Sequence, residues 1–343
     1  MSANLITGGA GFLGANLVRA VLDEPELADD ELVVLDDLSG GFRNNLPDDP
    51  RVTFIEGSVT DAQLIDELFE RHRFRFVYHL AAYAAEGLSH FIRRFNYTNN
   101  IVGSVTLTNA AVKYRSECFV FTSSIAVYGA AQVPTTEESV PRPQDPYGIA
   151  KYAVELDLQA AHDVFGLDHV IFRPHNVYGE YQNIGDKYRN VVGIFMNHLL
   201  EGKPMPIFGD GQQQRAFTYV GDVVPLLARA PLVPAARNQT FNIGAEQPCS
   251  VNELARNVAE AMNLPANIDY LSRRHEVDLA YSDHSKCHRV FSPIPETSLD
   301  EGLRRMAAWV REVGPRTSQE FPAIEVTDQL PESWARADSP KRR

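Results

Sequence analysis

The sequence predicts an α/β fold in which helices cover both faces of a doubly wound parallel sheet. Short apolar runs alternate with amphipathic, helix-length segments through the first half of the chain, as is typical of this class. Glycines also follow the first apolar run, where such a sheet makes its first strand-to-helix turn. The expected strands read NLIT, ELVVLDD, VTFIEG, FVYHLAA and CFVFTSS, and the expected helices include DAQLIDELFERH and the long segment from Phe91 to Tyr114.

Beyond Asn176 the alternation stops, which predicts a second, smaller lobe. The stretch 179–190 is polar and rich in turn residues, like loops that carry ligand contacts over a rigid scaffold. We expect a helix over VVGIFMNHLLEG, a hairpin over PIFGDGQQQRAFTYV and a strand near 240–244 that returns to the main sheet. The predicted division is a sheet domain over 1–175, a substrate-binding lobe mainly over 176–314 and an extended or frayed tail over 315–343.

Composition limits the classes of protein that the chain can belong to. A chain of 343 residues with 44% hydrophobic content can bury one large core and a smaller one. The net charge of −13 argues against nucleic-acid or anionic-membrane binding, so local basic residues must meet any anionic ligand. Three distant cysteines, no visible signal peptide and no bilayer-length apolar run predict a soluble, cytoplasmic protein without a metal site.

Gly8, Gly11 and Gly14 follow the first expected strand. Glycines at these points permit a tight turn, close approach of a pyrophosphate and tight packing of a helix whose N-terminus faces the phosphates. The second strand ends in Asp36, 22 residues beyond Gly14, and an acid there suits the ribose diol of NAD and repels the 2′-phosphate of NADP. The sequence therefore predicts a Rossmann-type sheet that binds NAD.

Small and polar residues stand at or near the ends of the next strands, where such a sheet binds its ligands. They are Ser58, Ala81, Ala82 and Asn100. Each is equally compatible with a turn or a helix cap, so both interpretations stay open at this point.

Tyr147 and Lys151, in the segment DPYGIAK, lie four residues apart and share one face if a helix begins after Pro146. An ammonium near a phenol lowers the phenol pKa from about 10, which makes a tyrosine a general base at neutral pH. Ser124 ends the strand CFVFTSS, and its hydroxyl can bond a reacting oxygen beside the tyrosine or, alternatively, its own turn backbone. Together with the glycine loop, these three side chains form a specific candidate catalytic set.

At these residues the chain resembles the extended short-chain dehydrogenase/reductases. Within them it is similar to the NAD-dependent nucleotide-sugar epimerases and dehydratases of the UDP-glucose 4-epimerase type. The matching segments are TGGAGFLG, VVLDDLSGG, YHLAA, SSIAVYG, PYGIAK, RPHNVYG and IFGDGQQQRAFTYVGDVV. They cover the chain from Asn4 to about Asp222, with a weaker match in SDHSK and LDEGL.

The resemblance implies a set of cofactor-binding residues and a set of substrate-binding residues. The cofactor set comprises Gly8, Gly11, Phe12, Leu13, Gly14, Asp36, Asp37, Leu38, Ser39, Gly40, Ser58, Val59, Leu80, Ala81, Ala82, Asn100, Tyr147, Lys151 and His175. The substrate set comprises Ser124, Tyr147, Asn176 on the diphosphate, and a basic clamp of Arg215 with Arg273 or Arg274. For the late arginines, plain surface solvation is an equal alternative.

Three departures from the family pattern stand out. Gly57–Ser58 replaces a frequent aspartate that contacts adenine, and Arg215–Ala216–Phe217 replaces a frequent Arg-Asp-Phe. His175 stands where an aromatic or aliphatic residue is common beside the nicotinamide, and we expect it to be packed and hydrogen-bonded there.

The resemblance implies an NAD-dependent epimerase that inverts C4 of a UDP-hexose or UDP-uronate through a 4-keto intermediate. In that mechanism Tyr147 exchanges the proton of the 4-hydroxyl, Ser124 bonds the same oxygen, and Lys151 holds the nicotinamide ribose. For a uronate, Lys187 or Arg189 is a candidate partner of the carboxylate. Helices Phe91–Tyr114 and Tyr147–Phe165 are expected to pair with a second copy, forming a homodimer.

Several alternatives use the same scaffold. A 4,6-dehydratase or a decarboxylase needs further proton transfer, yet Ile125 and Ala126 occupy the positions before Val-Tyr-Gly, where such enzymes carry an acid. Glu86 or His175 would then have to supply that group. A 4-keto reductase would consume added NADH or NADPH, and a non-catalytic dinucleotide sensor would have no need of Ser124, Tyr147 and Lys151 together.

Overall fold

A seven-stranded parallel sheet forms the centre of the molecule, with strand order β11-β6-β5-β4-β1-β2-β3. The computed structural model describes residues 2–273, 279–294, 296–317, 321 and 324–334. The strands are β1 (Ala3–Thr7), β2 (Glu31–Asp36), β3 (Val52–Glu56), β4 (Phe76–His79), β5 (Cys118–Thr122), β6 (His169–Pro174) and β11 (Gln239–Ile243). β11, in the segment where a returning strand was predicted, pairs with β6 at the sheet edge.

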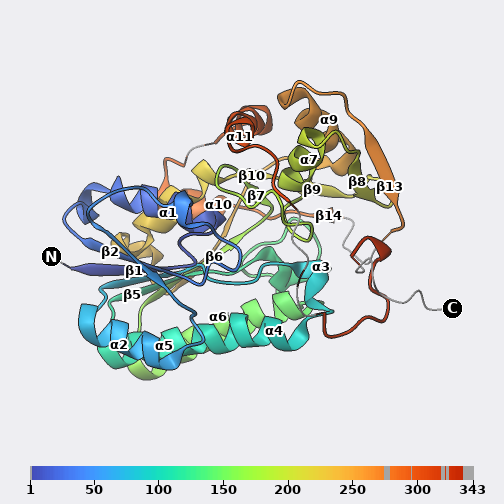
Figure 1. The fold of residues 1–343 in the computed structure, drawn as a ribbon. Coiled ribbons are helices and arrows are strands. Elements are labelled where there is room, and N and C mark those ends of the chain that lie inside the picture. Colours follow the sequence, from blue (N-terminus) through green and yellow to red (C-terminus); the bar gives the residue numbers. More distant parts are fainter. Residues whose placement is uncertain (1, 274–278, 295, 318–320, 322–323, 335–343) are drawn as a thin grey trace.

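Helices cover both faces of this sheet, which confirms the predicted Rossmann-type fold (Figure 1). One face carries α1 (Phe12–Leu22), which packs against α8 (Val224–Arg229). The other carries α2 (Ala62–His72), α5 (Gly103–Tyr114) and α6 (Pro146–Phe165). Because both faces are covered, the strands are continuous apolar runs. The side chains of successive residues point to opposite faces of the sheet and pack in different hydrophobic cores. Ile6, Val34 and Val120 face one core, whereas Leu5, Val33 and Phe119 face the other.

The segment from Phe91 to Tyr114, predicted as one long helix, is helical from Arg93 onward but changes type. α4 (Arg93–Tyr97) passes through a π-helical turn (Thr98–Val102) into α5. The wider turn places the Asn100 side chain where it bonds the backbone of Tyr83 in both directions. A short helix, α3 (Glu86–Ser89), precedes this run.

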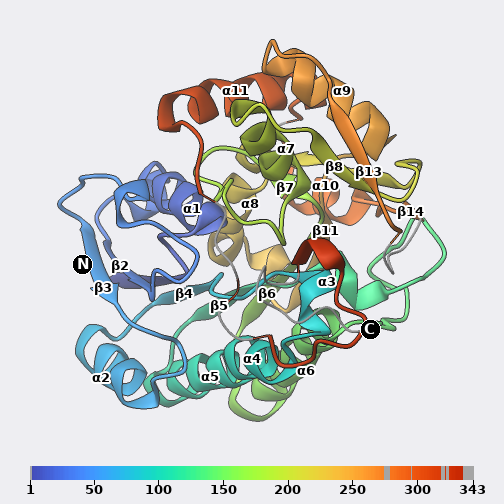
Figure 2. The same ribbon diagram turned by 45° about the vertical axis from the view of Figure 1, so that its right-hand side comes forward.

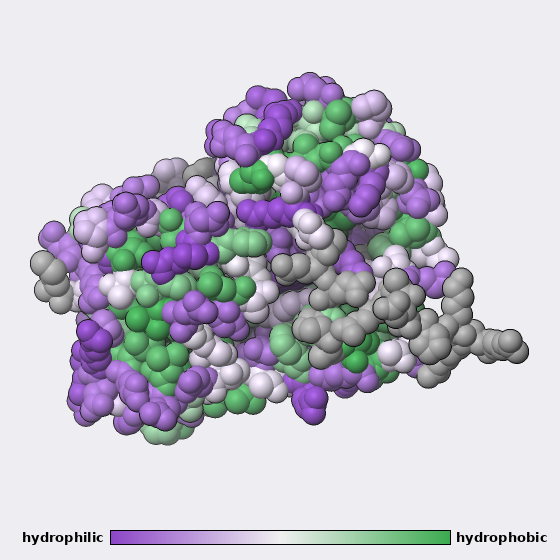
Figure 3. Space-filling view, in the orientation of Figure 1, coloured by the Kyte–Doolittle hydropathy of each residue, from purple (hydrophilic) through white to green (hydrophobic). Residues whose placement is uncertain are grey.

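A smaller lobe stands above the C-terminal edge of the sheet (Figure 2). Its helices are α7 (Val191–Leu200), α9 (Val251–Ala261) and α11 (Leu299–Val313), with α10 (Ser285–Phe291) beside β11. Its strands are β7 (Val177–Tyr178), β8 (Met205–Phe208), β9 (Gln214–Ala216), β10 (Thr218–Tyr219), β12 (Pro248–Ser250), β13 (Ile268–Leu271) and β14 (Leu279–Ala280). On the face in Figure 3, hydrophilic residues are spread over both parts. Among the described residues, no helix combines the length and apolarity needed to cross a bilayer.

The predicted hairpin over 206–220 was wrong, because its two arms pair with different partners. β8 pairs with β13, whereas β9 pairs with β12 and β14, and β10 pairs with β7. Two glycines with positive φ, Gly209 and Gly211, turn the chain from one small sheet to the next instead of folding it back on itself.

The described part of the C-terminal tail, predicted to be extended or frayed, is largely without helix or strand but is packed and not frayed. The ring of Phe321 contacts Tyr83, and Trp334 contacts Phe91 and the lobe residue Phe208. The Glu325 carboxylate accepts the backbone N–H groups at the start of α4. These aromatic residues are irregularly spaced, which is why the sequence shows no periodic signal there.

A buried ion pair joins α6 to β6. Arg173 donates to both carboxylate oxygens of Glu155, and each residue is 5% exposed. Arg173 also donates to the Tyr128 hydroxyl (2.7 Å), which in turn donates to Asn242 on β11 (2.7 Å). Ser123, directly after β5, donates to the same carboxylate. The network thus connects two neighbouring sheet strands, the edge strand and the longest helix.

Arg173→Met should lower the free energy of unfolding by about 3–5 kcal/mol, because it leaves the Glu155 carboxylate buried without its cation. Urea denaturation followed by circular dichroism would measure the change. Arg237→Met is the matched control, since the Arg237–Asp168 pair is about 30% exposed and should contribute less than about 1 kcal/mol. Equal losses in both variants would contradict the importance that we give to the buried pair.

Candidate active site

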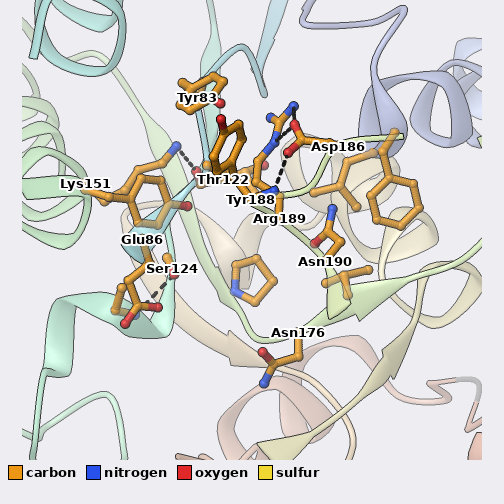
Figure 4. A pocket seen from close by; sticks show the side chains of 18 of the residues that line it. Tyr83, Glu86, Thr122, Ser124, Lys151, Asn176, Asp186, Tyr188, Arg189 and Asn190 are labelled. Carbon is orange, nitrogen blue, oxygen red and sulfur yellow. Dashed lines mark hydrogen bonds and ion pairs between the residues drawn. The ribbon is translucent and has the colours of Figure 1, made fainter. Parts of the chain in front are cut away.

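A cavity of about 980 Å³ lies at the C-terminal ends of the sheet strands, below the lobe (Figure 4). Residues that follow β1, β4, β5 and β6 line one side, and the loop 179–190 with β8 and β9 lines the other. The predicted site residues that line it are Gly8, Gly11, Phe12, Leu13, Gly14, Asp36, Asp37, Ser39, Gly40, Val59, Leu80, Ala81, Ala82, Ser124, Tyr147, Lys151, His175, Asn176 and Arg215.

Leu38, Ser58, Asn100 and Arg273 are not among the described residues that line the cavity. Ser58 bonds Thr60 within its own turn, and Asn100 bonds the Tyr83 backbone from inside the helical run. A role of either residue in cofactor binding stays a prediction. Leu38 has a positive φ, and its N–H donates to the Asp36 carboxylate. Arg273 lies beside Gly209, and Arg274 is outside the described residues.

The glycine loop packs so closely against neighbouring backbone that Gly8 and Gly14 leave no room for a larger side chain. Gly8 has φ +70°, and a Cβ there would stand 2.7 Å from the backbone nitrogen of Ala81. A Cβ on Gly14 would stand 2.1 Å from the Gly8 carbonyl oxygen, so α1 begins directly against the loop. The compact loop and the N-terminus of the helix both line the cavity, an arrangement that fits a dinucleotide pyrophosphate.

Asp36, at the end of β2, lines the cavity and is 7% exposed. Its carboxylate accepts the N–H groups of Ala10 (3.0 Å) and Leu38 (2.8 Å) and is thereby fixed to the glycine loop. Burial raises the pKa of this carboxyl above its usual range, although the two backbone bonds oppose the shift. The acid therefore stands at the expected adenosine-ribose end of the loop.

Tyr147 and Ser124 meet at the other end of the cavity. Asp145 caps α6 by accepting the Gly148 N–H (2.8 Å), and Pro146 begins the helix, so Tyr147 lies in its first turn. Ser124 accepts the Ala126 N–H (3.1 Å), the predicted turn bond, and its hydrogen bond with Tyr147 favours the phenolate. The predicted turn bond of Ser124 is thus present, and its bond to a reacting oxygen stays a prediction.

The expected lowering of the Tyr147 pKa by Lys151 was wrong for this structure. Burial is the largest effect and raises the pKa of Tyr147 well above its usual value. Lys151 donates to the carbonyl oxygen of Thr122 (2.7 Å), and its ammonium stands over the Tyr147 ring, 5.8 Å from the centroid. Burial also lowers the pKa of Lys151 to about 7, although the negative charge of Glu155 acts in the opposite direction and raises this pKa.

Glu86 lines the cavity and is an acid that lies outside the motif SSIAVYG, where the sequence shows no acidic residue. It begins α3, its side chain points toward Ser124, and its charge raises the pKa of Tyr147 (Figure 4). Ile125 and Ala126 also line the cavity and carry no ionisable group. A carboxylate thus stands beside the candidate catalytic pair after all, contributed by a different segment of the chain.

His175 is packed and hydrogen-bonded, as predicted. One ring nitrogen faces the Ala216 carbonyl (3.3 Å), the other lies 2.9 Å from His284, and burial lowers the pKa of His175 to about 3. The neighbouring Asn176 has φ +42° and donates to the same carbonyl (3.0 Å). A neutral, enclosed His175 is a wall of the cavity and not an acid or a base near pH 7.

The candidate cationic residues outside the catalytic set lie in two different pockets. Arg215 lines the cavity from β9, and Arg189 lines it from the 179–190 loop, paired with Asp186. Lys187 lines a separate small pocket beside α7, so only Arg189 of the two candidate carboxylate partners reaches the main cavity.

A glycine loop opening a parallel sheet, with Ser124, Tyr147 and Lys151 across the same cavity, defines a dinucleotide-dependent enzyme scaffold. A profile of the NAD dependent epimerase/dehydratase family matches residues 4–244. The chain belongs to this family, and NAD is its cofactor.

Individual relatives carry more than one activity. A UDP-glucose 4-epimerase of Mycolicibacterium smegmatis is 34% identical over 90% of this chain and 98% of its own length. A dTDP-glucose 4,6-dehydratase of an Actinoplanes species is 31% identical over 90% and 97%. The crystal structure of a Thermotoga maritima UDP-glucose 4-epimerase with UDP-glucose superposes with a TM-score of 0.83 at 33% identity, covering 91% of this chain and 99% of that one.

Lys151→Met should change how stability depends on pH. The lowered pKa means that folded Lys151 binds fewer protons than unfolded lysine between about pH 7 and 10.5, so the wild type gains stability as pH rises through this window. The variant lacks this gain, which amounts to at most about 1.4 kcal/mol per pH unit. Melting curves from pH 6 to 9 after NAD removal would test it, and parallel curves for the two proteins would contradict it.

Asp36→Asn should bind NADP markedly better than the wild type does. The amide oxygen can keep one of the two backbone N–H bonds that the two carboxylate oxygens accept, and the charge that repels a 2′-phosphate is gone. Calorimetric titration with NAD and NADP would measure the ratio of affinities. If the unmutated protein binds both cofactors equally, Asp36 does not select between them.

Proposed function

We propose that the protein is an NAD-dependent nucleotide-sugar 4-epimerase acting on a UDP-hexose or UDP-uronate. The observation that carries the proposal is the common cavity: the cofactor loop, Ser124 and Tyr147, and the lobe residues Asn176 and Arg215 all line it. In this proposal residues 1–175 with β11 hold the cofactor, and the lobe over 176–314 holds the nucleotide sugar. The relatives named as UDP-sugar epimerases support the choice of base.

In the proposed mechanism Tyr147 takes the proton of the sugar 4-hydroxyl, and Ser124 bonds the same oxygen. When bound, NAD supplies the hydride acceptor for oxidation at C4 and, in its reduced form, the hydride donor for the return step. Burial raises the pKa of Tyr147, whereas its hydrogen bond with Ser124 and the charge of Arg189 favour the phenolate. Lys151, whose ammonium stands over the Tyr147 ring, is proposed to hold the nicotinamide ribose. Asn176 and Arg215 hold the diphosphate while the 4-keto sugar turns its other face, and Tyr147 then returns the proton.

The wild type should convert at least one of UDP-glucose, UDP-galactose, UDP-glucuronate and their N-acetyl analogues into a two-component epimer mixture without added cofactor. NMR of the products identifies them. Tyr147→Phe should reduce kcat about 10²–10⁴-fold, the usual contribution of a positioned general acid–base group. A variant within a few-fold of the wild type would remove Tyr147 from the mechanism, and a need for stoichiometric NADH or NADPH would indicate a 4-keto reductase.

A nucleotide-sugar 4,6-dehydratase is the second candidate, and the position of Glu86 supports it. Loss of the 6-hydroxyl after oxidation at C4 needs an acid–base group beside the sugar, and Glu86 is a cavity carboxylate near Tyr147. The same NMR assay separates the two reactions, because a dehydratase yields a 4-keto-6-deoxy sugar. Under our proposal that product is absent, and Glu86→Gln retains epimerisation.

We further propose a cytoplasmic homodimer formed through the helices below the sheet in Figure 1. Ile149 and Leu156 are seven residues apart on α6, and they and Val102 are 40%, 55% and 52% exposed. Such a row of apolar side chains at helical spacing suits pairing with the same surface of a second copy.

Leu156→Glu should therefore shift the protein from dimer to monomer in light scattering at micromolar concentration, because a carboxylate would be buried in the interface. Val140→Glu is the control, since Val140 is 68% exposed outside these helices. A wild type that is already monomeric would rule out the dimer.

A further inference from the structure

Few lysine and arginine side chains line the main cavity, although it must hold an anionic cofactor. The chain has a net charge of −13, and the lysines and arginines among the described lining residues are Lys151, Arg189 and Arg215. Lys151 is bound to the Thr122 carbonyl at the catalytic end, and Arg215 belongs to β9 in the lobe. A pyrophosphate on the glycine loop carries two negative charges, so the remaining cation, Arg189, is the one to examine.

Arg189 reaches from the lobe to the sheet. It lies in the 179–190 loop just before α7, yet its Nη2 atom would stand 3.1 Å from a Cβ placed on Gly40, in the loop after β2. Its guanidinium also stacks over the Tyr83 ring, 4.7 Å from the centroid, in the segment after β4. The side chain is 16% exposed and spans the cavity beside the expected cofactor path (Figure 4).

The position of this guanidinium is fixed by its neighbours. Asp186 accepts from its Nε (2.7 Å) and from its Nη2 (2.6 Å), and the Tyr188 N–H bonds the other oxygen of that carboxylate (2.9 Å). Tyr188 packs against Trp334, and its hydroxyl accepts the Phe321 N–H. Two of the five guanidinium donors are used by Asp186, and an arginine can bind a second oxyanion with the others.

We propose that Arg189 is a diphosphate-binding residue that holds the pyrophosphate of NAD against the glycine loop from the lobe side. The dinucleotide, and not the nucleotide sugar, is the ligand because Gly40 and Tyr83 belong to the cofactor side of the cavity, while Arg215 stands at the lobe end. The inference depends on the cofactor alone and is independent of the proposed epimerisation.

Arg189→Gln should lower the affinity for NAD and for ADP-ribose about 10- to 100-fold, the range expected for charge-assisted hydrogen bonds to phosphate. Affinity for adenosine, which has no phosphate, should not change. Asp186→Asn is the matched variant: it breaks the same ion pair but keeps the cation, so it should bind ADP-ribose at least as tightly as the wild type. Lys187→Ala, in the separate pocket, should also behave as the wild type.

The measurements are the NAD content of each protein after gel filtration and calorimetric titration with NAD, ADP-ribose, adenosine and UDP. Equal loss in Arg189→Gln and Asp186→Asn would overturn the proposal, because the ion pair would then only shape the loop. Weaker adenosine binding in Arg189→Gln would overturn it for the same reason. Loss of UDP affinity with unchanged ADP-ribose affinity would assign the residue to the substrate diphosphate instead.

Discussion

The ion pair between Arg173 and Glu155 is the interaction on which the candidate active site depends most directly. Two charges at 5% exposure are stable only if each is fully hydrogen-bonded, and here Ser123 and Tyr128 complete the set. The pair therefore holds β5, β6 and α6 at fixed distances. Ser124 follows Ser123 directly, and Lys151 lies one helical turn before Glu155. The same contacts that join sheet and helix thus align the candidate catalytic side chains.

The same carboxylate also influences the chemistry of its neighbour. Burial lowers the pKa of Lys151, and the negative charge of Glu155 is the opposing effect. Tyr147, one helical turn before Lys151 on α6, is held protonated by burial and by the nearby charges of Asp145 and Glu86. The chain therefore keeps a neutral phenol and a cation of lowered pKa in close proximity, and small changes in local charge alter the proton balance between them.

Short sequence patterns predicted those features of the structure that depend on residues close together in the chain. The glycine loop, Asp36 and the Tyr147–Lys151 pair each depend on spacing within one strand–turn–helix unit, and the cavity brings them together. Glu86 and Arg189 were harder to assign, because their positions depend on where α3 and the 179–190 loop pack against distant strands. The pKa of Tyr147 was predicted with the wrong sign, since spacing indicates a neighbouring ammonium but not the depth of burial. Strand partners in the lobe were likewise invisible, because β8 and β9 each pair with segments far along the chain.

The packed tail has a consequence for how ligands enter and leave. Trp334 contacts Phe91 beside the sheet and Phe208 in the lobe, and Phe321 contacts Tyr83 on the cavity wall. Sheet and lobe therefore cannot swing apart as rigid bodies about the connection after β6 without first detaching this aromatic segment. Detachment exposes several large rings to water, which makes wide opening an infrequent event.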